Sequence, residues 1–76
     1  MSERVVLDAR GLKCPLPVLR ARKAMRPLNP GDVLVVLATD PAAGPDFEAF
    51  CATTGDRLVA SRVADGVTTI EIAKAG

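Results

Sequence analysis

Apolar residues occur along the chain in short runs separated by glycine, proline and acidic turn residues. The segments defined in this way are 4–8, 15–26, 33–38, 46–54, 57–63 and 67–72. Segment 4–8 contains a β-branched apolar run, which predicts a strand. Segment 33–38 has six apolar residues in a row, which is typical of a central strand or one buried on both faces. Segments 57–63 and 67–72 flank Asp65-Gly66, a strong hairpin signal, and are predicted to be strands.

The other two segments have the spacing of helices. In 15–26, a broad apolar face can be shared by Val18, Leu19, Ala21 and Met25, and Pro15 suits the first helical position. In 46–54, two phenylalanines and Cys51 lie on one face, and a glycine follows as a stop signal. The order is therefore βαβαββ, and the chain is predicted to be one domain over residues 1–76. The simplest α/β solution is a two-layer sandwich, in which a four-stranded mixed sheet carries both helices on one face.

Residues 11–17, GLKCPLP, combine a reactive atom with a means of activating it. Cys14 is predicted to be the N-cap of the first helix, at the positive end of the helix dipole. Arg10 and Lys13 are the nearest cations, and such surroundings lower the pKa of a thiol. Pro15 and Pro17 would then fix the turn that presents Cys14.

The sequence LDARGLKCPLP of residues 7–17 resembles the signature of the TusA family of sulfur carriers, also called SirA-like. Residues 29–32, 39–41 and 50–51 are also similar, so the resemblance covers nearly the whole chain. It implies the same fold, and a sulfurtransferase in which Cys14 carries sulfane sulfur as a persulfide. It also implies a cysteine desulfurase or rhodanese-like donor, and an acceptor in tRNA thiolation, molybdenum-cofactor or sulfur metabolism. Leu16 stands where some family members have an acidic residue.

Charge is distributed unevenly along the chain. Residues 1–26 hold seven of the ten cations and two of the nine acids, for a net charge of +5, and residues 27–76 carry −4. These cations could simply keep a helix face solvated, or they could receive acidic partners. On the second interpretation Leu16, Arg20 and Lys23 contact partner proteins. The carrier is expected to be monomeric when alone.

Several residues have ordinary structural interpretations beside the functional ones. Cys51 is predicted to be a core residue, with a resolving thiol as the alternative. Asp8 and Asp40 suit turns and caps, although the ends of two parallel strands could bring them near Cys14, where an acid would raise the thiol pKa.

Composition excludes other classes of function. The chain has no histidine, which excludes an internal Cys–His pair and leaves poor material for a zinc site, so no metal or cofactor is expected. Neither a membrane span nor a signal peptide is evident, which predicts a cytoplasmic protein. A small RNA-binding or regulatory module remains an alternative, but two phenylalanines offer no stacking platform, so no direct nucleic-acid contact is expected. A redox protein using both cysteines is the third possibility.

Overall fold

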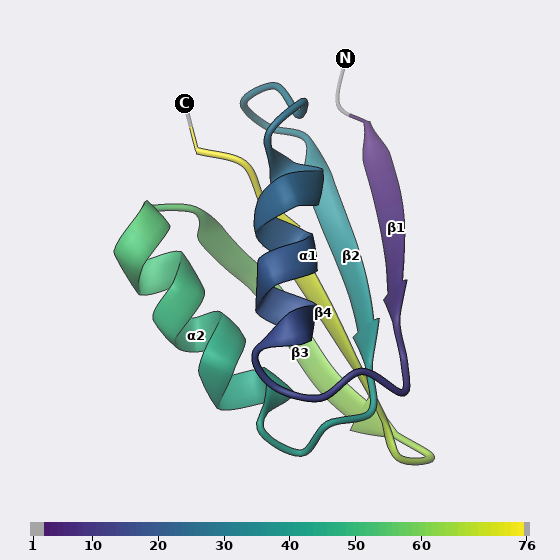
Figure 1. The fold of residues 1–76 in the computed structure, drawn as a ribbon. Coiled ribbons are helices and arrows are strands. Elements are labelled where there is room, and N and C mark those ends of the chain that lie inside the picture. The colour runs from purple at the N-terminus through teal and green to yellow at the C-terminus, as the bar shows by residue number, and fades with distance from the viewer. Residues whose placement is uncertain (1–2, 76) are drawn as a thin grey trace.

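The computed structural model describes residues 3–75, which form four strands and two helices (Figure 1). In chain order the elements are β1 (Arg4–Ala9), α1 (Leu16–Met25), β2 (Val33–Ala38), α2 (Ala43–Thr54), β3 (Arg57–Ala64) and β4 (Val67–Ala73). The strands form one sheet in the order β1-β2-β4-β3, with β1 parallel to β2 and the other pairs antiparallel. Both helices lie on the same face of this sheet. The predicted βαβαββ order and mixed sheet are confirmed.

The helix starts differ from those predicted. Helix α1 begins at Leu16 with Pro15 as its N-cap, so Cys14 lies one residue before the cap and the N-cap prediction is wrong. The reason is a tight turn in which the Leu16 N–H donates to the Lys13 carbonyl at 2.8 Å. Helix α2 begins at Ala43 rather than Asp46. Its first turn tolerates Pro45, because first-turn N–H groups have no intrahelical acceptor to lose.

The core lies between the sheet and the two helices. The largest of its fully buried side chains are those of Phe47, Leu34, Val36, Ile70 and Ile72. Alternation along β4 directs Thr68, Ile70 and Ile72 inward. The Phe47 ring packs against the Phe50 ring edge to face, with centroids 6.0 Å apart. Aromatic pairs prefer this arrangement. Cys51 is 7% exposed in the same cluster, which confirms that it is a core residue.

The opposite face of the sheet is partly covered by an ion pair. Arg4 on β1 pairs with Glu71 on β4, although β2 lies between these strands. The two side chains must therefore pass over β2. This explains why Val35 is only 7% exposed, although it lies outside the cluster under the helices. Within the described residues no helix covers this face, so the Arg4–Glu71 pair shields Val35 from solvent instead.

Candidate functional site

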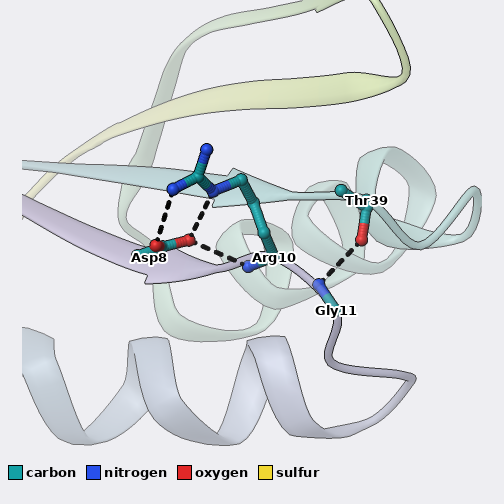
Figure 2. Close-up of polar contacts among 4 residues, drawn as sticks. All are labelled: Asp8, Arg10, Gly11 and Thr39. Atoms are coloured by element: carbon teal, nitrogen blue, oxygen red, sulfur yellow. Dashed lines mark hydrogen bonds and ion pairs between the residues drawn. The ribbon is translucent and has the colours of Figure 1, made fainter.

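Two loops meet where the parallel strands β1 and β2 end side by side. Ala9 and Ala38 are paired at the last position of the ladder, so the segments that follow them leave the sheet together. The Gly11 N–H donates to the Thr39 hydroxyl at 2.8 Å, as Figure 2 shows. Gly11 has a φ of +81°, a conformation that a glycine adopts without strain. This contact fixes the start of the loop that carries Cys14.

Asp40 holds the cysteine itself in place. Its Oδ2 accepts the Cys14 N–H at 2.6 Å, and its Oδ1 accepts the Ala42 N–H at 2.9 Å. These two bonds, first from Ala42 and then from Cys14, lower the pKa of the Asp40 carboxyl, because they stabilise its charged form. One carboxylate therefore joins the cysteine loop to the segment that starts α2. Both interpretations offered for Asp40, turn chemistry and proximity to the cysteine, describe this residue.

The thiol of Cys14 is exposed, but its surroundings are acidic rather than basic. A hydrogen bond with the Asp46 carboxylate raises its pKa, followed by partial desolvation and the negative charges of Asp46 and Asp40. The prediction of a lowered thiol pKa is therefore contradicted. The physical reason is that the first turn of α2 brings Asp46 to the cysteine. Sequence reasoning missed Asp46, because an acid in the first turn of a helix is common. Its presence does not indicate which distant residues it will contact in the fold.

The predicted supporting cations are directed elsewhere. Arg10 donates to Asp8 through Nε and Nη2, both at 2.9 Å, and its backbone N–H donates to the same carboxylate at 3.1 Å (Figure 2). This pairing lowers the pKa of Asp8 to about 2. Arg10 is therefore engaged by its near neighbour and not by the thiol. Lys13 is exposed, and its charge acts on Asp40, whose pKa it helps to lower.

The remaining predicted residues lie along α1. Pro15 is exposed in the turn beside the thiol, whereas Pro17 is buried against the core. Leu16 is 44% exposed, a large apolar side chain left open to solvent next to the cysteine. Arg20 and Lys23 are exposed further along the helix. The structure thus brings Pro15 and Leu16 to the cysteine, and the two cations lie further along α1.

Two hollows border the cysteine. One, of about 270 Å³, lies between the helices and is lined in part by Cys14, Val18, Arg22, Asp46 and Phe50. The other, of about 440 Å³, lies over the paired loops and includes Cys14, Thr39 and Asp40. An additional sulfur atom on Cys14 can therefore be accommodated on either side. Among residues 3–75 no group of three or more potential metal ligands is present, and no helix is long and apolar enough to cross a membrane.

Comparison with known proteins identifies the family. The sequence model of a family described as sulfurtransferase TusA matches residues 5–74. A protein of Neisseria meningitidis is 56% identical over 66 residues, which cover 87% of this chain and 89% of that protein. The sulfur carrier protein TusA of Allochromatium vinosum is 50% identical over 60 residues, 79% of each chain. The crystal structure of the SirA-like protein of Desulfitobacterium hafniense matches with a TM-score of 0.83 at 28% identity, covering 95% of this chain and 99% of that one.

These matches span nearly the whole chain and agree in fold and in family. The chain therefore belongs to the TusA family of sulfurtransferases, and the family predicted from residues 7–17 is confirmed.

Proposed function

We propose that this chain is a sulfur carrier that accepts sulfane sulfur on Cys14 as a persulfide and delivers it to an acceptor protein. The observation that carries the proposal is the contrast between the two thiols. Cys14 is exposed on a loop anchored at its backbone by Asp40, whereas Cys51 is in the core. Membership of the TusA family and the names of its relatives support the same role.

The transfer is a pair of thiol–persulfide exchanges. The Cys14 thiolate attacks the terminal sulfur of a donor persulfide, the new S–S bond forms on Cys14, and the donor cysteine leaves as a thiolate. An acceptor thiolate then attacks the terminal sulfur on Cys14, and the Cys14 thiolate leaves. Neither step needs an external oxidant or reductant. Each step needs an accessible thiolate and space for one more sulfur atom. The two hollows beside Cys14 supply that space.

The acidic surroundings of Cys14 impose a condition on this mechanism. Because Asp46 and Asp40 raise the thiol pKa, the carrier at neutral pH holds Cys14 largely as the thiol. The proton must therefore leave when sulfur is accepted, and either the Asp46 carboxylate beside the thiol or a basic group of the donor protein accepts it. The donor is expected to be a cysteine desulfurase or a rhodanese-like protein in the cytoplasm, with the carrier monomeric between encounters.

The test is sulfur loading followed by intact mass. Wild-type protein incubated with a cysteine desulfurase and cysteine should gain one sulfur, about 32 Da, and Cys51→Ala should gain the same. Cys14→Ala should gain none, while its circular dichroism and urea midpoint stay close to those of wild type, because Cys14 lies outside the core. Equal loading of Cys14→Ala and wild type would refute the assignment.

A further inference from the structure

A groove runs beside α1 on the side away from α2, over the outermost strand of the sheet. Its volume is about 600 Å³, and it is lined by Leu7 of β1 and by Leu19, Arg20, Lys23 and Ala24 of α1. Strand β1 stands at the end of the strand order, visible at the edge of the sheet in Figure 1. The groove is therefore bounded by a helix on one side and by an open strand edge on the other.

The lining combines apolar surface with positive charge. Leu19 is 52% exposed, so its side chain is open to contact from an occupant of the groove. This exposure contradicts the prediction that Leu19 belongs to the buried apolar face of the helix. Arg20 and Lys23 are exposed beside it, and no carboxylate belongs to the lining among the described residues. An occupant should therefore present apolar side chains together with negative charge.

The open edge of β1 adds a third requirement. The Val33 N–H donates to the Glu3 carbonyl at 2.8 Å, so the backbone groups of Glu3 face β2. Because these groups alternate along an extended strand, the backbone N–H and C=O groups of Arg4, Val6 and Asp8 point away from the sheet. They can pair with one further extended segment, which is how exposed sheet edges bind peptides.

We propose that this groove, formed by the β1 edge and the Leu19–Lys23 face of α1, binds an extended acidic segment of a partner protein. The segment adds a strand to β1, places apolar side chains against Leu7 and Leu19, and sets carboxylates against Arg20 and Lys23. The identity of the partner, but not the binding itself, rests on the proposed function, since such a partner would exchange sulfur with Cys14.

The position of the groove fits that use. Leu16, Leu19 and Lys23 follow one another along the same side of α1 at helical spacing, and span about 10 Å of its axis. Leu16 is next to the cysteine turn, and Lys23 is at the far end. A segment held here is anchored beside the thiol without covering it, so a partner can stay attached while its own cysteine approaches.

The probe is a fluorescent ten-residue peptide in which every second residue is valine or glutamate in turn and the residues between them are threonine, so that valines and glutamates point to the same face of an added strand. Fluorescence anisotropy at 50 mM salt should show binding to wild-type protein. The double variant Arg20→Glu/Lys23→Glu should bind at least about tenfold more weakly, since each reversed charge both removes an attraction and adds a repulsion. Arg57→Glu/Arg62→Glu is the matched control, because it makes the same charge change on β3, the opposite edge strand. Its affinity for the peptide should stay close to that of the wild-type protein.

Two further measurements test whether the peptide binds as an added strand on β1, and separate this proposal from the carrier function. In ¹⁵N NMR spectra the peptide should shift and protect the amides of Val6 and Asp8. Shifts confined to β3, or equal binding by both double variants, would overturn the proposal. So would binding of only a poly-uridine RNA or a laurate micelle. Glutathione persulfide should load Cys14 equally in the wild-type protein and in both double variants. Failure of the wild-type protein to load would count against the carrier function and not against the groove.

Discussion

The fully buried ring of Phe47 links the stability of the fold to the protection of Cys51. Both residues lie in α2, one helical turn apart and facing the core. Replacing a buried phenylalanine by alanine costs about 3–5 kcal/mol. At about 0.05–0.15 kcal/mol per residue, a domain of this length has a stability of roughly 4–11 kcal/mol. Phe47→Ala should therefore remove a large part of the total without necessarily abolishing folding.

The size of the effect can be read from the two thiols. Alkylation of buried Cys51 requires an opening of the structure, whose population rises tenfold for each 1.4 kcal/mol lost. The rate at Cys51 should thus increase by roughly two to three and a half powers of ten in Phe47→Ala, while the rate at exposed Cys14 stays constant. Both thiols have a raised pKa, Cys14 chiefly through Asp46 and Cys51 through burial, so the labelling rate of each thiol is compared with its own rate in the wild-type protein.

The assay is iodoacetamide labelling followed by peptide mass spectrometry, with a urea titration of the same samples. Val63→Ala is the matched control, because that side chain is 71% exposed and its loss should change neither quantity. The reasoning fails if Cys51 in the wild-type protein labels within about tenfold of Cys14. It also fails if Phe47→Ala lowers the urea stability without accelerating Cys51.

Three smaller changes test the polar contacts. Asp46→Asn should lower the pKa of Cys14, so that its alkylation profile moves to lower pH, whereas Glu48→Gln, on an exposed position of the same helix, should not move it. Asp40→Ala should speed hydrogen exchange of the Cys14 amide, which loses its acceptor. Asp32 accepts two backbone N–H groups, which lower its pKa, so its contribution to stability is present above its unfolded pKa of about 4 and is lost as pH falls through the folded value. Asp32→Asn should accordingly weaken the loss of stability in acid, measured by urea titrations between pH 6 and pH 2.

The parts of this protein that sequence could predict are those that depend on local periodicity. The six elements, their order and the burial of Cys51 follow from spacings of two, three and four residues. The charge environment of Cys14 does not, because Asp46 reaches it from a helix whose first turn is placed only by the folded sheet. Arg10 shows a different failure. Asp8, two residues earlier, and the Cys14 thiol are both possible partners of its guanidinium. The sequence alone does not determine which of them it contacts.

The separation of Cys14 from the core has a consequence for how this carrier fails. An exposed thiol can be oxidised to a sulfinic acid, which no longer accepts sulfur. Because Cys14 itself is exposed and lies outside the buried cluster, the oxidised chain is expected to stay folded. Because cellular proteases recognise unfolded chains, such a chain escapes removal. If Cys14 carries the sulfur and the groove binds partners, as we propose, the oxidised copies compete with the working ones, and sulfur flow falls by more than the fraction of molecules that has been damaged.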